Sequence, residues 1–236
     1  MTLAVKNGAA VALPAEAALP LAKVEVDGTS TFRLTSNSSF SFSTAPALDI
    51  ASGGTADLAS AVDLTVSSLT LGGTPQAVGY SYGSSASGAD VKNACFSGTG
   101  VVRMPGTIVA DVHVWKGPAG GKWSANENWE PAGPIGFGNV LVFDSTAGAI
   151  STENDLDLVK ISGIRLKGDN PILLSGKTCR IVAGGIGVLG EAGSLATVDF
   201  ALPLDLVRES VQPIPYVAAS GQVFRVTGAI SGAADF

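Results

Sequence analysis

The sequence predicts an all-β protein made of stacked strands, and three observations support this prediction. Glycine supplies 30 of the 236 residues, well above its usual share. Apolar and polar residues alternate with a period of two over several short segments, which is typical of strands with one buried face. Glycine-containing turns separate these segments. We therefore expect a β-solenoid-like stack in two units, with two packed β-sandwiches or barrels as the alternative.

The first predicted strands come early in the chain. Residues Lys23–Leu34 (KVEVDGTSTFRL) alternate on both sides of a turn at Gly28, and Ser39–Phe42 alternates in the same way. Pro14 and Pro20 interrupt the Ala-rich run that precedes them, so no helix is expected there.

Two later segments echo each other. LTVSSLTLGG (Leu64–Gly73) and VKISGIRLKG (Val159–Gly168) align at an offset of 95 residues. An apolar-x-apolar pair followed by glycine suits one rung of a stacked β-coil, because the apolar residues face the stack and glycine allows the corner. Two unrelated strands are the alternative. The matched pairs are Val66 with Ile161, Leu69 with Ile164, Leu71 with Leu166, and Gly73 with Gly168.

The remaining chain adds one clear strand and a proline-rich stretch. Val140–Phe143 reads as a strand, whereas Pro203, Pro213 and Pro215 confine their segment to edge strands or loops.

A change in residue composition marks a boundary near residue 110. All three tryptophans fall in the stretch that follows it, VWKGPAGGKWSANENW. We predict that residues 1–110 are the C-terminal part of a first β-rich unit, and that residues 111–236 are a second β-rich unit that opens with this Trp-rich segment.

The second unit contains a series of short motifs in a fixed order, which are Trp115 with Gly117, Trp123-Ser124, Asn128-Trp129, Leu141-Val142-Phe143, Asn154-Asp155 and Gly184-Gly185. With these motifs the second unit resembles the opening of an autotransporter-associated β-strand repeat module, and Leu48–Met104 resembles the end of a preceding module of that kind. Together the two stretches cover about two thirds of the chain. The resemblance implies a right-handed β-solenoid, or a related stacked architecture, from a large secreted or surface bacterial protein, and it supplies no catalytic residue.

Charge and composition argue against several classes of function. The formal net charge is −6 and both halves are acidic, so no nucleic-acid partner is expected. A single histidine argues against a multi-histidine metal site, and we expect neither a metal nor a cofactor. The uncharged stretch Leu64–Ala89 is rich in serine and glycine and contains Pro75, so it is not a membrane span. No signal peptide is visible, and the first residues read like the interior of a longer β protein.

Two aspartates could form an acid-protease dyad. Such a dyad needs two carboxylates that share a proton, each on an Asp-Thr/Ser-Gly loop after an apolar strand. Asp27 is followed by Gly and Thr in exchanged order, and Asp144 is followed by Ser but has its Gly two positions late. The alternative is that each caps an ordinary turn after a strand.

The tryptophans allow a second kind of site. Trp115, Trp123 and Trp129 could form a platform on which sugar rings stack. The alternative is that the three indoles pack over the open end of the β stack and cap it.

Other polar features have ordinary explanations. The acidic turn Glu153–Asp157 could hold Ca²⁺ but lacks the usual loop, and His113 reads as a half-exposed strand residue. Cys95 and Cys179 could form a disulfide or be two buried thiols.

These features lead to a ranked set of functions. We predict a structural or adhesive module of a secreted or cell-surface bacterial protein, whose partner is an extracellular protein or glycan such as mucin. The alternative is an aspartic-type protease that degrades extracellular glycoprotein such as mucin with Asp27 and Asp144. A carbohydrate-binding module that uses Trp115, Trp123 and Trp129 is the second alternative.

Overall fold

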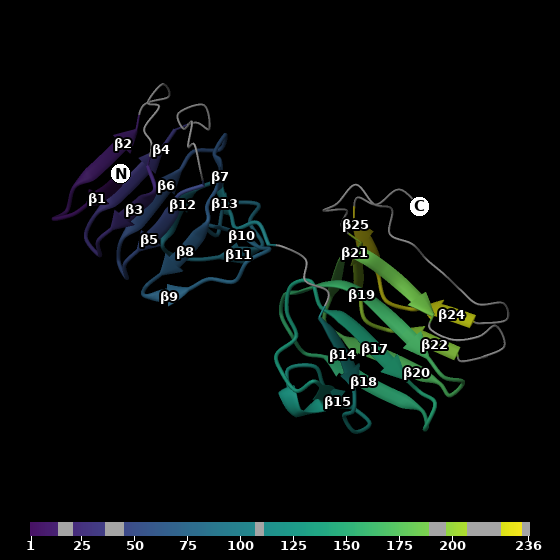
Figure 1. Ribbon diagram of the computed structural model, residues 1–236. Coiled ribbons are helices and arrows are strands. Elements are labelled where there is room, and N and C mark those ends of the chain that lie inside the picture. Colours follow the sequence, from purple (N-terminus) through teal and green to yellow (C-terminus); the bar gives the residue numbers. More distant parts are fainter. Residues whose placement is uncertain (14–20, 36–44, 107–110, 189–196, 207–222, 233–236) are drawn as a thin grey trace. The chain divides into compact units, whose positions relative to one another are not determined.

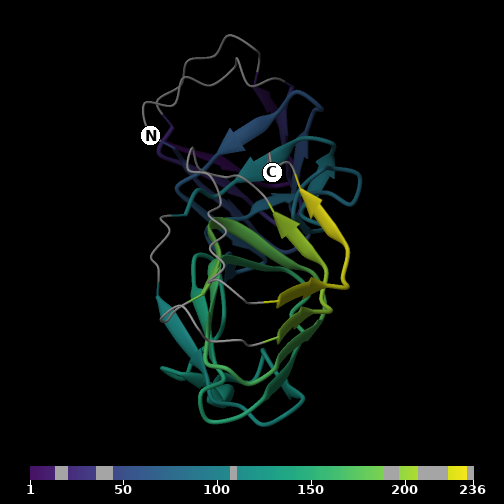
Figure 2. The same cartoon turned by 90° about the vertical axis from the view of Figure 1, so that its right-hand side faces the viewer.

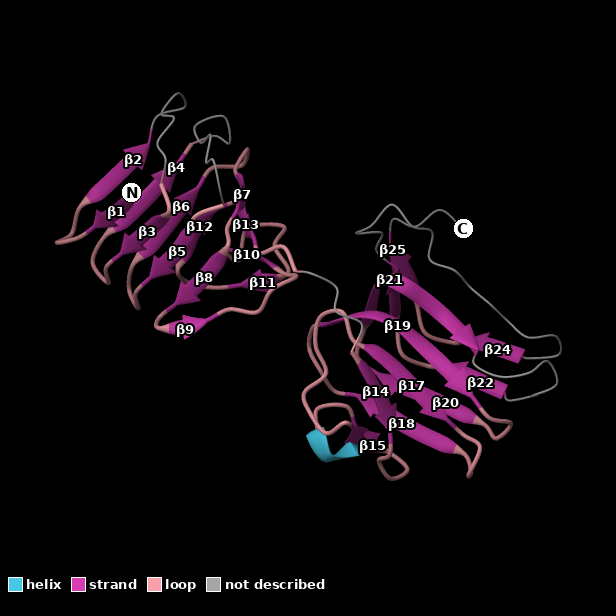
Figure 3. Ribbon diagram, viewed as in Figure 1, coloured by secondary structure: helices cyan, strands magenta, loops and turns pink. Residues whose placement is uncertain are grey.

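A computed structural model describes the chain except for residues 14–20, 36–44, 107–110, 189–196, 207–222 and 233–236. The chain divides into two compact units, Met1–Gly106 and Thr107–Phe236. About 52% of the protein is strand and 2% is helix, and stacked parallel strands form a β-solenoid of about 8 turns (Figures 1 and 3). The prediction of an all-β solenoid is therefore confirmed.

The first unit, called unit 1 below, contains thirteen described strands. They are β1 (Thr2–Val5), β2 (Ala10–Leu13), β3 (Lys23–Val26), β4 (Thr31–Leu34), β5 (Ala47–Ile50), β6 (Thr55–Leu58), β7 (Asp63–Thr65), β8 (Ser68–Leu71), β9 (Thr74–Pro75), β10 (Ser81–Gly83), β11 (Val91–Lys92), β12 (Phe96–Gly98) and β13 (Val101–Arg103).

Unit 1 coils because each strand pairs with the strand one turn later. Strands β1, β3, β5 and β8 form one parallel ladder, and β2, β4, β6 and β12 form another. The alternating pattern turns every second side chain inward, so the apolar set of each strand fills the coil. The buried residues of the two ladders are Val5, Val24, Val26, Leu48, Ile50, Leu69, Leu71, Leu13, Phe32, Leu34, Ala56, Leu58 and Phe96.

Stacked turns require glycine between these ladders. A Cβ on Gly28 would lie 2.4 Å from the carbonyl oxygen of Ser52 in the next turn. Gly53 has a φ of +88°, and its Cβ would lie 2.5 Å from the carbonyl oxygen of Gly28. Only glycine allows backbones to stack this closely.

Over its described residues, the second unit, unit 2, contains twelve strands and one 3₁₀ turn at Asn126–Asn128. The strands are β14 (Val112–Trp115), β15 (Gly121–Lys122), β16 (Trp129–Glu130), β17 (Val140–Asp144), β18 (Ile150–Asn154), β19 (Val159–Lys167), β20 (Ile172–Gly176), β21 (Cys179–Val188), β22 (Thr197–Phe200), β23 (Leu204–Leu206), β24 (Val223–Val226) and β25 (Ile230–Gly232).

Unit 2 is a coil of the same kind, and its strands, coloured teal to yellow, stack in successive turns in Figure 2. One ladder runs β14-β17-β19-β21-β23-β25 and the other runs β15-β18-β20-β22-β24, with all these neighbours parallel. The register of β19 with β21 shifts between Ile161 and Gly163. The first part of β19 therefore lies in line with β23 and β25, whereas its second part lies beside β17.

The sequence echo marks equivalent corners in the two units. Val66 and Ile161 are both fully buried, and Gly73 and Gly168 both have positive φ, at +83° and +91°. In unit 1 the corner separates β7 from β8, whereas in unit 2 the shift at Ser162 leaves β19 as one long strand. By this alignment β8 corresponds to the second part of β19.

The structure describes some of the other predicted elements and leaves others outside the described residues. Val140–Phe143 lies in β17, as predicted, and Lys23–Leu34 becomes β3, a turn and β4. Ser39–Phe42 lies outside the described residues, as do Pro213 and Pro215. Among the residues that the structure describes, no helix is long and apolar enough to span a membrane.

Candidate functional site

Asp27 caps the turn between β3 and β4. The N–H and Oγ1 of Thr29 both donate to its Oδ1 at 3.0 Å, and the N–H of Asn7 in the preceding turn donates to its Oδ2 at 2.7 Å. The pKa of Asp27 is held well below its usual range by the nearby Ser30 hydroxyl and by the N–H groups of Thr29 and Asn7. The Ser30 hydroxyl lies close to the carboxylate but makes no well-formed hydrogen bond. The carboxylate therefore joins two successive turns of the coil.

Asp144 has the same role after β17. The N–H and Oγ1 of Thr146 donate to its Oδ1 at 3.1 Å and 2.5 Å, and the Lys167 ammonium lies 2.8 Å from its Oδ2. Lys167, followed by the Thr146 hydroxyl, lowers the pKa of Asp144 to about 2.

These contacts do not favour an acid dyad. A dyad needs two carboxylates that share a proton, whereas each of these carboxylates accepts hydrogen bonds from donors that lower its pKa. Asp27 belongs to unit 1 and Asp144 to unit 2, and each is brought together with hydrogen-bond donors of its own unit. Both aspartates fit the turn-capping alternative.

The three tryptophans form an aromatic cluster inside unit 2. Trp115, Trp123 and Trp129 are 5%, 0% and 2% exposed. Trp115 and Trp129 pack edge to face with ring centres 5.0 Å apart. The ring centre of Trp123 lies 5.8 Å from the ring centre of Phe143 on β17. Trp129 Nε1 donates to the carbonyl oxygen of Trp123 at 2.9 Å, whereas the buried Nε1 of Trp123 has no partner.

This cluster covers the first rung of unit 2. Trp115 lies on β14, and Trp129 lies opposite it on the antiparallel strand β16. A sugar platform needs an exposed indole face, and these indoles present none, so their placement fits the capping alternative. His113 packs edge-on against Trp129 and its Nδ1 lies 3.0 Å from the Pro131 carbonyl oxygen. This histidine is buried rather than half-exposed because both neighbours cover it.

The acidic turn after β18 is bound to its own chain. Asn154 is fully buried, and its Nδ2 donates to the carbonyl oxygen of Lys177 at 2.9 Å. Asp155 accepts hydrogen bonds from the N–H and Oγ of Ser124, and Asp157 pairs with the ammonium of Lys177. Over the described ranges, no group of three or more His, Cys, Asp or Glu side chains is arranged to hold a metal ion.

Both cysteines are free thiols. Cys95 lies in unit 1 and is half-buried, whereas Cys179 lies in unit 2 and is fully buried. Burial raises the pKa of both thiols above the ordinary value. Neither thiol has the lowered pKa of a reactive cysteine.

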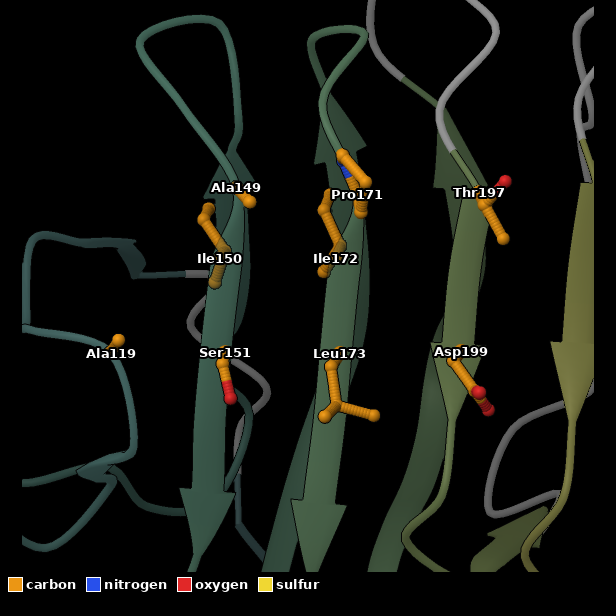
Figure 4. Close-up of a pocket in the computed structure, with 9 residues that line it drawn as sticks. All are labelled: Ala119, Ala149, Ile150, Ser151, Pro171, Ile172, Leu173, Thr197 and Asp199. Atoms are coloured by element: carbon orange, nitrogen blue, oxygen red, sulfur yellow. The ribbon is translucent and has the colours of Figure 1, made fainter.

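A shallow groove on the outer face of unit 2 was not predicted. It has a volume of about 420 Å³ and crosses β18, β20 and β22 (Figure 4). Leu173 lies at its centre and is 38% exposed, although it stands between the buried residues Ile172 and Leu174. The sequence signal for this groove is the run of three apolar residues Ile172–Leu174. Successive side chains of a strand point to opposite faces, so the middle residue of such a run must point outward when its neighbours are buried. The groove is lined by Ala119, Ala149, Ile150, Ser151, Pro171, Ile172, Leu173, Thr197 and Asp199.

Polar groups lie beside this apolar surface. Ser151, Leu173 and Asp199 occupy one register row across β18, β20 and β22. Asp199 accepts a hydrogen bond from Thr227 Oγ1 at 3.1 Å and lies 3.9 Å from Nη1 of Arg225. The groove thus combines an exposed leucine with a serine hydroxyl and a partly exposed carboxylate.

Comparison of the chain with protein-family models, curated proteins and solved structures finds no match. The fold alone therefore defines the class of the protein, which is a β-solenoid of two units.

Proposed function

We propose that this protein is a structural or adhesive module of a secreted or cell-surface bacterial protein, and that it binds an extracellular protein or glycoprotein such as mucin. One observation carries the proposal: the groove around Leu173 exposes apolar surface on a regular face of the solenoid. A surface of this kind gains free energy when a partner covers it.

The surroundings of Leu173 suit a polypeptide partner. Ile150 and Pro171 widen the apolar surface, and Ser151 and Asp199 lie within the same groove to receive polar groups. An apolar centre with polar groups near it is the usual composition of a protein-binding surface. The resemblance to autotransporter-associated modules supports the extracellular location.

The aspartates and tryptophans have no catalytic or sugar-binding role in this proposal. Asp27 and Asp144 are occupied by turn hydrogen bonds, and the three indoles are buried. Their geometry is explained by the stability of the coil.

A binding assay on immobilised mucin tests the proposal. Wild type is compared with Leu173→Asp, which places a charge at the centre of the groove. Val78→Asp is the matched control, because Val78 is similarly exposed, at 47%, but belongs to unit 1. We expect saturable binding that Leu173→Asp weakens by about tenfold or more, equivalent to ~1.4 kcal/mol. The control should bind like wild type.

Three outcomes would contradict the proposal. Absence of saturable binding to mucin, or equal losses in Leu173→Asp and Val78→Asp, would remove the groove as the binding surface. Mucin and casein are also incubated with the protein between roughly pH 3 and 7. Acid-dependent cleavage that is lost in both Asp27→Asn and Asp144→Asn would replace the adhesive function with an aspartic protease.

A further inference from the structure

The groove around Leu173 lies within a sheet and not at its edge. Strand β18 pairs with β15 and β20, strand β20 pairs with β18 and β22, and strand β22 pairs with β20 and β24. Leu173 is therefore exposed because its side chain points outward between two neighbouring strands. The groove is a property of this face of unit 2 and does not depend on where the ladder stops.

The groove carries charge of one sign. Ile150, Pro171 and Leu173 supply most of its apolar surface. Among the described residues that line the groove, Asp199 is the only one with a charged side chain. A ligand that fills the groove therefore contacts apolar carbon atoms and meets a carboxylate beside them.

The apolar and the charged parts of the groove lie in one row across the strands. Leu173 on β20 is the register partner of Asp199 on β22 and of Ser151 on β18. Figure 4 shows Leu173 between the other two residues. Neighbouring strands lie about 4.8 Å apart, so the row from Ser151 to Asp199 is about 10 Å long. An unbranched side chain laid along this row covers Leu173 and brings its end to Asp199.

The contacts of Asp199 within the described chain leave its Oδ2 accessible to a partner group. Its Oδ1 accepts a hydrogen bond from Thr227 Oγ1 at 3.1 Å. Arg225 Nη1 lies 3.9 Å from Oδ2, which is beyond hydrogen-bond distance, and the Arg225 side chain is 63% exposed. An exposed ion pair with this geometry contributes little free energy. A cation supplied by a partner can therefore take the place of Arg225 at Oδ2.

We propose that the groove receives a lysine side chain of the partner polypeptide, with the methylene stem over Leu173 and the ammonium at Oδ2 of Asp199. This inference rests on the proposed function, because it names the group of the partner that the same groove recognises. Lysine combines a long apolar stem with a compact charge. Arginine fits less well, because its planar fork binds a carboxylate best through both oxygens and Thr227 occupies Oδ1.

Charge and hydrogen-bonding capacity both favour a cationic group over an anionic one. The formal net charge of the chain is −6, so its field attracts cations, and an acidic group in the groove would be repelled by Asp199. An ammonium has three donors and no acceptor. The hydroxyls of Ser151 and Thr197, which also line the groove, supply acceptors in addition to the carboxylate.

An NMR titration of the isotope-labelled protein with Nα-acetyl-lysine amide tests the proposal without mucin. The comparison ligand is Nα,Nε-diacetyl-lysine amide, which keeps the stem and loses the charge. We expect saturable shifts of the Leu173 and Asp199 signals with a dissociation constant of about 10 mM or tighter, and binding of the diacetylated ligand that is weaker by about fivefold or more.

Two variants make this titration specific. Asp199→Asn keeps an oxygen that accepts the Thr227 hydrogen bond, and it should bind the two ligands equally because the charge is gone. Glu127→Gln is the matched control, because it removes an exposed carboxylate of unit 2 that does not line the groove, and it should behave like wild type. Thermal unfolding confirms that both variants are folded.

Mucin whose lysines have been acetylated connects this inference with the proposed function. We expect acetylation to weaken the binding of wild type by about fivefold or more, and to leave the weaker binding of Asp199→Asn unchanged. Equal binding of the two amide ligands, a difference that Asp199→Asn preserves, or equal binding of native and acetylated mucin would overturn the lysine site, while adhesion through Leu173 would stand. Binding of the lysine ligand that depends on Asp199, without any binding to mucin, would support the lysine site and remove mucin as the partner.

Discussion

At the scale of single residues, polar side chains mainly hold successive turns together. Asn154 is the clearest case, since it is fully buried and its amide bonds to the backbone of the next turn. The sequence predicted a turn here but not a buried asparagine. Burial of this residue depends on Lys177 and Thr178, more than twenty positions later in the chain, and no local pattern encodes that contact.

Asp144 should make the stability of unit 2 dependent on pH. Its pKa is lowered from 3.8 to about 2 in the folded protein, so its contribution is present above about pH 4 and is lost as the pH falls through about 2. We expect Asp144→Asn to lower the free energy of unfolding by about 1–2 kcal/mol at neutral pH, and the difference to vanish near pH 2. Chemical unfolding at several pH values, followed by tryptophan fluorescence, measures this. Glu127→Gln, which removes an exposed carboxylate of the same unit, is the control. A difference that does not vary with pH would exclude an electrostatic origin.

At the scale of elements, alternation predicted strands well and failed to predict corners. It located β3 and β4, which each bury one face against a neighbouring rung. It also located β17, although Leu141, Val142 and Phe143 are all buried there. The shift within β19 was not predictable, because Val159–Lys167 reads as one segment and only pairing with β21 reveals the bend. The groove was not predicted because Leu173 is apolar and exposed on β20, whereas strands were predicted from alternating apolar, buried and polar, exposed residues.

Glycine in the turns of unit 1 should be required for steric reasons. Gly28→Ala would place a Cβ 2.4 Å from the Ser52 carbonyl oxygen, and backbone atoms must then move apart. We expect a loss of about 1–3 kcal/mol in the free energy of unfolding, measured by chemical denaturation and circular dichroism. Gly88→Ala is the matched control in the same unit, because a Cβ there meets no atom within 4 Å. Its stability should stay close to that of wild type, and an equal loss in both variants would argue against the steric explanation.

At the scale of the whole molecule, the sequence predicted a solenoid in two units but could not predict which strands share a ladder. The sharp change near the Trp-rich segment is explained by the start of a separate aromatic core in unit 2. Ladders are defined by pairing between strands that are distant in the sequence. They therefore become visible only when the fold of the described chain is known.

Separate cores predict that the two units unfold independently. All three tryptophans lie in unit 2, so their fluorescence reports on that unit, whereas circular dichroism reports on both. Leu58 in unit 1 and Leu141 in unit 2 are both fully buried, and replacing either with alanine should cost about 2–5 kcal/mol. We expect Leu141→Ala to shift the fluorescence transition in urea. Leu58→Ala should shift part of the circular dichroism transition and leave the fluorescence unchanged. A fluorescence shift of equal size in both variants would mean that the units unfold as one cooperative body.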